Sequence, residues 1–189
     1  VYSYIITCME SSIPMSHKQR IKRNIRFALI TVSTSRFKKY GSAKSPQEAE
    51  DLSGDRMYTL IKESGHEIIS YSLVPDDPAS IRDLISSMLG EDVDVIVTCG
   101  GTGLSPDDVT IEAISPLFHK KMQGFGEYFR YLSIGQIGSS VVLTRACAGI
   151  VDDKVIFCIP GSPKAVDLAF SEVILPEAGH ILKHLGKVA

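Results

Sequence analysis

The feature that most constrains the fold is a regular alternation of short β-prone segments with helical patterns, which begins near Ile25. Strands that alternate with helices of about 10–15 residues are typical of an α/β sandwich with a parallel sheet. The segments with strand character are Ile25–Thr31, His66–Val74, Val93–Cys99, Val141–Ala148 and Val155–Ile159. The sequence therefore predicts a three-layer αβα sandwich with a mostly parallel sheet.

Two of these segments indicate how the sheet is built. Val93–Cys99 is almost continuously apolar, as expected for a strand whose two faces are both covered by helices. The last two predicted strands are joined by a short turn at Asp152-Asp153. A parallel crossover needs a dozen or more residues, so we expect these two strands to form one antiparallel pair.

Capping residues mark where the predicted helices begin and end. One helix opens at Ser53, and Gly65 ends it as a C-terminal glycine. Asp77 is a good N-cap, and Pro78 after it suits the first helical position. The helical stretches are expected at 53–64, Pro78–Leu89, Asp108–Leu117, Gly126–Ile134 and from Pro163 through Leu185. The polar segment Ser33–Glu50 shows no helical period and is predicted to be a long loop, a kind of segment that is often functional.

Length and charge limit the domain organisation and the classes of partner. The chain has 189 residues and a formal net charge of −2. We expect a flexible N-terminal arm at residues 1–23 and a single domain at residues 24–189. A weakly acidic chain argues against nucleic-acid binding, which needs an excess of basic residues on one face.

The chain is also expected to be cytoplasmic and free of membrane spans. No apolar run approaches the roughly 20 residues that a membrane span needs. The basic cluster Lys18–Arg23 follows the apolar opening segment, whereas a secretory signal has its positive charges first. Three of the four cysteines, Cys99, Cys147 and Cys158, lie in apolar, strand-like segments, and we interpret them as buried thiols. A disulfide or a metal site is the alternative.

Polar and glycine-rich segments follow three of the predicted strands. They are Pro75–Asp77, Gly100–Asp108 and Pro160–Pro163. In open α/β sheets the ligand crevice lies beyond the carboxyl ends of the strands. We therefore expect these three segments to converge at one edge of the domain and to form a binding site there.

Two of these segments have features of anion-binding loops. The three glycines of Gly100-Gly101-Thr102-Gly103 allow a sharp turn and a close approach of backbone N–H groups to an anion. In the second segment, Gly161 permits an unusual backbone angle, Ser162 is a natural N-cap, and Pro163 fits the first helical position, so the helix N-terminus suits a phosphate. The alternatives are a tight turn without a ligand and simple helix capping. Two such loops at one edge favour a polyanionic substrate.

Carboxylates accompany the same loops. Asp76 and Asp77 follow one strand, and Asp107 and Asp108 follow the glycine segment. Carboxylates beside a phosphate repel it unless a cation lies between them, and Mg²⁺ commonly binds one or two carboxylates together with phosphate oxygens. Because Asp77 has a structural role as an N-cap, Asp76 is the better candidate ligand. Ordinary capping at both places is the alternative.

Two arginines near these segments could balance the charge of a polyanionic substrate. They are Arg130 and Arg145. A guanidinium group can bind phosphate oxygens through two parallel hydrogen bonds. A solvated surface position is the alternative interpretation for both side chains.

Four segments, in this order along the chain, resemble the signature of the MoaB/MogA family of molybdenum cofactor biosynthesis proteins. The segments are Val97–Thr110, Gly124–Arg130, Ser139–Gly149 and Pro160–Pro163. The similarity extends roughly from Ile25 to Leu185 and looks closest to the MoaB branch. The resemblance implies a molybdopterin-binding α/β domain that assembles as a homotrimer, or as a homohexamer of two trimers.

The resemblance also implies an activity, molybdopterin adenylyltransferase, in which ATP is the co-substrate and Mg²⁺ the cofactor. Asp76 and Asp108 match the catalytic aspartates of the family, and we expect both to bind magnesium. The positions expected to bind molybdopterin or nucleotide are Thr98, Gly100, Gly101, Thr102, Gly103, Ser105, Gly126, Glu127, Arg145, Gly149, Pro160, Gly161, Ser162 and Pro163.

The sequence departs from the family pattern at two positions. Asp107 stands where many active members carry arginine, and Ile111 stands where they carry proline. An acidic group in place of a basic one weakens the electrostatic support for a transition state at a triphosphate. The alternative function is therefore a catalytically inactive oligomer that binds molybdopterin and carries or protects it. A relative of the same fold that acts on another phosphorylated substrate is a further alternative.

Overall fold

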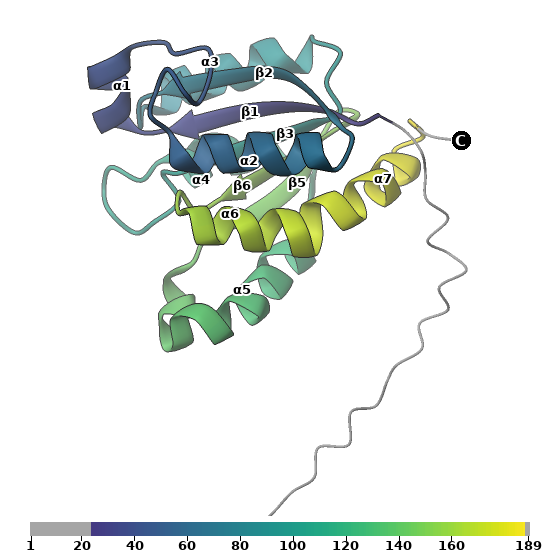
Figure 1. Ribbon diagram of the computed structural model, residues 1–189. Helices are drawn as coiled ribbons and strands as arrows, with labels where there is room; N and C mark the ends of the chain where they lie inside the picture. The colour runs from purple at the N-terminus through teal and green to yellow at the C-terminus, as the bar shows by residue number, and fades with distance from the viewer. Residues whose placement is uncertain (1–23, 188–189) are drawn as a thin grey trace, which may run out of the picture.

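A six-stranded sheet forms the centre of the computed structural model, which describes residues 24–187 (Figure 1). The strand order is β2-β1-β3-β6-β5-β4. The strands are β1 (Arg26–Val32), β2 (Glu67–Val74), β3 (Val95–Cys99), β4 (Lys120–Lys121), β5 (Cys147–Val151) and β6 (Lys154–Ile159). The pairs β2/β1, β1/β3 and β3/β6 are parallel, and β6/β5 and β5/β4 are antiparallel. The expected N-terminal arm lies outside the described residues.

Helices cover both faces of the sheet. They are α1 (Thr34–Tyr40), α2 (Leu52–Glu63), α3 (Pro78–Leu89), α4 (Thr110–Ile114), α5 (Gln123–Ile137), α6 (Pro163–Ala169) and α7 (Leu175–His184). Buried side chains of α2, α5, α6 and α7 pack in a core on one face, and those of α3 and α4 pack in a core on the other. The predicted three-layer αβα sandwich with a mostly parallel sheet is therefore confirmed.

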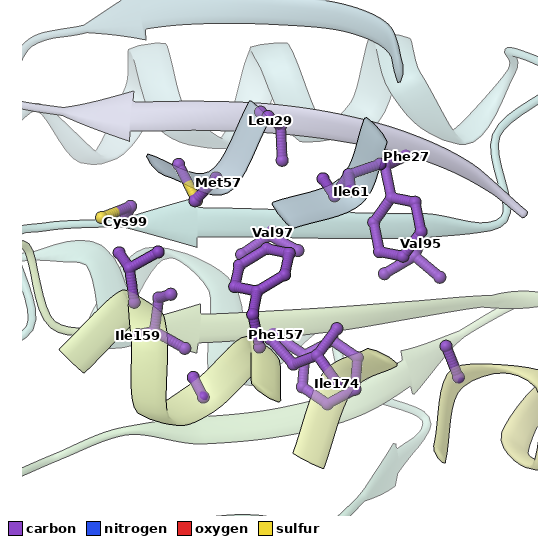
Figure 2. Close-up of a cluster of buried hydrophobic side chains, with 14 of the residues drawn as sticks. Phe27, Leu29, Met57, Ile61, Val95, Val97, Cys99, Phe157, Ile159 and Ile174 are labelled. Atoms are coloured by element: carbon purple, nitrogen blue, oxygen red, sulfur yellow. The ribbon is translucent and has the colours of Figure 1, made fainter. Parts of the chain in front are cut away.

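The two cores come from the alternation of side chains along the central strands. In β3, Val95, Val97 and Cys99 point to the core that contains α2, whereas Ile96 points to the core that contains α3. Figure 2 shows the first of these cores, where residues of β1, β3 and β6 meet Met57 and other side chains of the covering helices. All five residues of β3 are buried, which explains its continuous apolar sequence.

The predicted strand at Val141–Ala148 is wrong over its first six residues. Residues Gly138–Leu143 form a 3₁₀ helix, and β5 begins only at Cys147. The antiparallel register ends at the pair of Cys147 with Cys158, one residue before β6 ends at Ile159. Pro160 follows, and a proline has no N–H group with which to continue the pairing.

The predicted loop at Ser33–Glu50 contains a helix, α1. Ser33 accepts a hydrogen bond from the backbone N–H of Arg36 as its N-cap. α1 has seven residues and only two apolar ones, Phe37 and Tyr40, which are partly buried against the core, so its apolar stripe is too short to predict a helix from the sequence. Within residues 24–187, no helix combines the length and apolar character needed to cross a membrane.

Candidate functional site

The segments that follow β2, β3 and β6 meet at one edge of the sheet, as the sequence predicts, and the segment that follows β1 joins them there. The backbone N–H of Ser33 donates to the carbonyl oxygen of Val74 at 2.9 Å, which joins the ends of β1 and β2. The N–H of Gly100 donates to the carbonyl oxygen of Ile159 at 3.1 Å, which joins the ends of β3 and β6. These strands are parallel, so their carboxyl ends lie at the same edge.

The glycine loop after β3 requires its glycines for steric reasons. Gly100 and Gly101 have φ angles of 106° and 61°, a conformation that side chains disfavour. A Cβ atom on Gly100 would lie 2.4 Å from the carbonyl oxygen of Val32. Thr110 holds the loop in place, because its hydroxyl donates to the Gly100 carbonyl and its N–H to the Gly101 carbonyl, both at 2.9 Å.

Asp76 and Asp108 lie against the same loop. The Oδ2 atom of Asp76 accepts hydrogen bonds from the N–H and hydroxyl of Thr34, each at 2.8 Å, and its Oδ1 atom would lie 2.8 Å from a Cβ on Gly101. The Oδ2 atom of Asp108 would lie 2.6 Å from a Cβ on Gly103. Gly101 and Gly103 are two positions apart, and two residues of chain span at most about 7 Å. Both carboxylates therefore lie beside the same short stretch of the glycine loop.

A cavity of about 290 Å³ opens beside the glycine loop. Its lining residues are Gly100, Gly101, Thr102, Gly103, Asp108, Leu143, Thr144, Arg145, Pro160 and Gly161. Eight of these positions belong to the predicted site, whereas Asp76 lies against the loop at Gly101 but does not line the cavity. Leu143 and Thr144 are additions, and both fall in the segment Ser139–Gly149 that carries part of the family resemblance.

Arg145 lies in the wall of this cavity and is bonded to several neighbouring residues. Its Nε atom donates to the carbonyl oxygen of Thr102 at 3.1 Å, and its Nη2 atom to the carbonyl oxygen of Asp108 at 3.3 Å. The guanidinium group also forms a salt bridge with Glu112, and its hydrogen bond lowers the pKa of that carboxyl group. Arg145 is thus held against the glycine loop rather than solvated freely.

The Arg145–Glu112 pair predicts a pH-dependent contribution to stability. Because the pKa of Glu112 is lowered in the folded state, the contribution is present above the ordinary glutamate pKa of about 4.3 and is lost as the pH falls. The Glu112 side chain is 52% exposed, so the effect should be under about 1 kcal/mol. In urea unfolding, Glu112→Gln should be less stable than the parent at pH 7 and equal to it well below pH 4. Glu91→Gln, at an exposed position, is the control, and the same pH trend for both variants would refute the assignment.

A larger cavity, of about 490 Å³, lies on the other side of Arg145. Its wall combines the cationic side chains of Lys121, Arg130 and Arg145 with the ring of Phe118 and with apolar side chains such as Ile111 and Met122. The lining residues are Ile111, Ser115, Phe118, Lys121, Met122, Gln123, Gly126, Glu127, Arg130, Arg145, Ala146, Cys147 and Ala148. The sequence singled out Gly126, Glu127, Arg130 and Arg145. Ala146, Cys147 and Ala148 fall in the segment Ser139–Gly149, which carries part of the family resemblance, whereas the lining residues from Ile111 to Gln123 were not expected.

Several predicted site residues line neither cavity. Thr98 is fully buried within the sheet, and Ser105 is exposed on the loop. Gly149 leaves room for the ring of Phe118, because a Cβ atom on residue 149 would lie 2.3 Å from the Cγ atom of that ring. Ser162 is the N-cap of α6 and accepts from the N–H of Ala165 at 3.2 Å, with Pro163 in the first position. These residues shape the site from outside its walls.

The prediction that Gly161 adopts an unusual backbone angle is wrong. Gly161 does not have a positive φ angle. Instead, a Cβ on it would lie 3.3 Å from the Cα of Gly100, so a small residue is needed where the two loops touch. The hydroxyl of Ser53 donates to the Gly161 carbonyl at 2.8 Å and fixes this loop to the start of α2. The sequence predicts Ser53 only as a helix-opening residue.

The carboxylates at the loop suit a magnesium ion that is shared with a phosphate. Among residues 24–187 no three or more His, Cys, Asp or Glu side chains form a metal-binding cluster. Asp76 and Asp108 each use Oδ2 for backbone hydrogen bonds, whereas no hydrogen bond to Oδ1 is found within the described part of the chain. Mg²⁺ takes few protein carboxylates and completes its coordination with phosphate oxygens and water, so two free carboxylate oxygens fit it.

The sequence and the fold match known proteins. A family model described as "Probable molybdopterin binding domain" matches residues 28–180. A protein of Bacillus anthracis named "Molybdenum cofactor biosynthesis protein B" is 44% identical over 167 residues, which cover 87% of this chain and 93% of the relative. Its namesake in Staphylococcus aureus strain MRSA252 is 40% identical over 178 residues, which cover 92% and 100%.

Solved structures agree with these sequence matches. The crystal structure of the tungsten cofactor synthesizing protein MoaB from Pyrococcus furiosus is similar with a TM-score of 0.75 and 38% identity, covering 86% of this chain and 97% of that one. A crystal structure of a molybdenum cofactor biosynthesis protein B has a TM-score of 0.78 and 41% identity, covering 87% and 98%. This chain belongs to the MoaB/MogA family of molybdenum cofactor biosynthesis proteins, with the molybdopterin-binding domain of that family.

Proposed function

We propose that this protein is a molybdopterin adenylyltransferase. The terminal phosphate oxygen of molybdopterin attacks the α-phosphorus of ATP, the bond from that phosphorus to the oxygen bridging the α- and β-phosphates breaks, and pyrophosphate leaves. The nucleophile is already an oxyanion, so no side chain is needed to remove a proton. The protein therefore acts through positioning and charge neutralisation, as in related phosphoryl transfers.

The observation that carries this proposal is the pair of adjoining cavities that share Arg145. The smaller one lies on the glycine loop, where backbone N–H groups suit phosphates. The larger one has the volume of a typical small-molecule site and combines Phe118 and Met122 with Lys121 and Arg130. ATP phosphates in the first and a phosphorylated pterin in the second would bring both reacting groups to the Arg145 guanidinium.

The charged and anion-binding groups in and around the smaller cavity each have a role in this transfer. The glycine loop and the N-terminus of α6 would bind phosphate oxygens, and Arg145 would stabilise the charge that develops during transfer. Asp76 and Asp108 would hold Mg²⁺. When bound, magnesium neutralises phosphate charge and favours the departure of pyrophosphate.

One feature of the sequence, Asp107, favours the alternative of pterin binding without turnover, but its position in the structure reduces the force of this argument. Asp107 stands where many active family members carry arginine. Its side chain is exposed and lines neither cavity, while its N–H donates to the hydroxyl of Ser105 at 3.4 Å. A carboxylate in that position perturbs a phosphate in the cavity less than one in the wall would, which supports the enzymatic function.

A turnover assay separates the two functions. The protein is incubated with molybdopterin, ATP and magnesium chloride, and both pyrophosphate and adenylylated molybdopterin are quantified. Adenylyl transfer predicts equal amounts of the two products and none when any one component is left out. Saturable binding of molybdopterin without release of pyrophosphate would instead support the carrier function.

We further propose that the protein is a homo-oligomer, a trimer or a hexamer, which contacts its own copies through α5. This helix and the 3₁₀ segment after it expose an apolar surface. Its members, with their exposed fractions, are Tyr128 (47%), Tyr131 (68%), Ile134 (51%), Ile137 (46%), Val142 (78%) and Leu143 (54%). Contiguous exposed apolar surface of this kind marks interaction sites.

The oligomer proposal predicts the effect of one charge at this surface. Tyr131→Glu should shift the sedimentation coefficient toward that of the monomer, because an unpaired carboxylate would have to be buried in the contact. Leu52→Glu is the matched control, since Leu52 is 72% exposed and lies outside the surface on α5. A parent protein that sediments as a monomer, or equal coefficients for parent and Tyr131→Glu, would contradict the proposal.

A further inference from the structure

Two cysteines face each other across the antiparallel strands β5 and β6. The strand register pairs Cys147 directly with Cys158. Residues directly opposite in antiparallel strands have Cα atoms about 4.5–5.5 Å apart and side chains on the same face. Disulfides form at Cα separations of about 4.4–6.8 Å. Both thiols are free in this structure, and they can be joined without a change in the strand pairing.

The two thiols differ in their access to solvent. Cys147 is half-buried and lines the larger cavity, whereas Cys158 is fully buried behind it. Cys99, the remaining cysteine within residues 24–187, is buried on the opposite face of the sheet. Burial raises the pKa of Cys99 and keeps it protonated. An oxidant that enters the larger cavity therefore meets Cys147 before the other described thiols.

The groups around Cys147 favour its thiolate, which is the reactive form of a cysteine. The Cys158 thiol can donate a hydrogen bond to the Cys147 sulfur, which lowers the pKa of Cys147, and the charges of Lys121 and Arg145 act in the same direction. The same contact, together with burial, raises the pKa of Cys158. A more acidic thiol at the half-buried position that lines the cavity, with a buried thiol behind it, is the arrangement of an attacking cysteine and a resolving cysteine.

We propose that Cys147 and Cys158 form a reversible disulfide when a hydroperoxide enters the larger cavity. The Cys147 thiolate attacks the peroxide, the O–O bond breaks, and Cys147 becomes a sulfenic acid while water or an alcohol leaves after taking up a proton. The Cys158 sulfur then attacks the sulfenic sulfur, the S–S bond forms, and water leaves with the thiol proton. Two thiols are oxidised by two electrons, and one hydroperoxide is reduced.

This disulfide has a consequence for the cavity. Ala146, Cys147 and Ala148 all line its wall, so a bond from Cys147 to Cys158 fixes that wall to β6. It also protects the exposed sulfur from further oxidation to sulfinic and sulfonic acids, which thiols do not reverse. The inference depends on the strand register and on burial, and it is independent of which ligand the cavity binds.

The proposal is tested by mapping the oxidised thiols in the full chain. Cys8 lies outside the described residues, so the parent for this test carries Cys8→Ser. The protein is treated with hydrogen peroxide, alkylated with N-ethylmaleimide in denaturant, digested and analysed by mass spectrometry. We expect a peptide cross-linked between Cys147 and Cys158 and an alkylated Cys99. Dithiothreitol should restore alkylation at both linked positions.

Single variants make the test specific. Cys158→Ser should accumulate sulfinic and sulfonic acid at Cys147, whereas Cys99→Ser should form the cross-link as the parent does. Thermal unfolding of each variant checks that it is folded. Over-oxidised Cys147 in the parent together with an alkylated Cys158, a cross-link to Cys99, or no oxidation of Cys147 would each overturn the proposal.

Discussion

Asp108→Asn should lower the rate of pyrophosphate release by about 10²–10³-fold, the loss commonly seen when one electrostatic contact to a transition state is removed. The Asp108 carboxylate lines the smaller cavity beside Gly103, where ATP phosphates and magnesium are proposed to bind. Asparagine has the same shape and keeps an oxygen that can accept the hydrogen bond from the N–H of Ser105. The substitution therefore removes charge while it preserves the turn.

Asp107→Asn is the matched control for this experiment. Asp107 is the adjacent residue with the same side chain, but it is exposed and lines neither cavity. Initial rates at saturating ATP and molybdopterin should differ little between Asp107→Asn and the parent, and thermal unfolding should be similar for all three proteins. Equal rates for Asp108→Asn and the parent would remove Asp108 from the mechanism.

Gly101→Ala should lower the free energy of unfolding by about 2–4 kcal/mol. The φ angle of Gly101 is 61°, which strains any residue with a Cβ. The new methyl group would also lie 2.4 Å from the hydroxyl oxygen of Thr110 and 2.8 Å from Oδ1 of Asp76. The Thr110 hydroxyl holds the loop through its hydrogen bond to the Gly100 carbonyl, so relief of the clash must move the loop.

Gly124→Ala controls for the general effect of adding a methyl group. Gly124 is exposed in the first turn of α5 and has no positive φ angle, and a Cβ atom on it would meet no other side chain of residues 24–187 within 4 Å. Its unfolding free energy should stay within about 0.5 kcal/mol of the parent or rise slightly. Urea unfolding followed by circular dichroism gives both values. Similar midpoints for the two variants would contradict the steric account of the loop.

Much of the fold could be predicted from the sequence because its signals are local. Asp77 and Pro78 mark the start of α3, and the Asp77 side chain accepts from the N–H of Ser80 at 2.7 Å as an N-cap should. The position of the glycine loop beyond β3 follows from the chemistry of Gly100 and Gly101 and from the general rule for parallel sheets. The predicted strand at Val141–Ala148 is wrong because its limit is set by Pro160, a residue of the neighbouring segment.

The larger cavity could not be predicted, since it depends on tertiary contacts. Phe118 comes near β5 because Gly149 leaves space for its ring, and a sequence does not reveal which ring will fill that space. Arg145 is held by the carbonyl oxygens of Thr102 and Asp108, which are distant in sequence and carry no side-chain signal. The sequence therefore predicts charged residues near the site, but not that one of them joins two cavities.

A crystal structure of the protein with molybdopterin, magnesium and an ATP analogue that has a methylene group between its α- and β-phosphates tests the central claim most directly. The analogue cannot be cleaved at the reacting bond, so both ligands should be seen together. We expect its α-phosphate against the backbone of Gly101–Gly103 near Asp108, the pterin in the larger cavity, and the terminal phosphate of molybdopterin beside Arg145. A nucleotide bound away from the glycine loop, or two ligands that compete for one cavity, would contradict the proposed transfer.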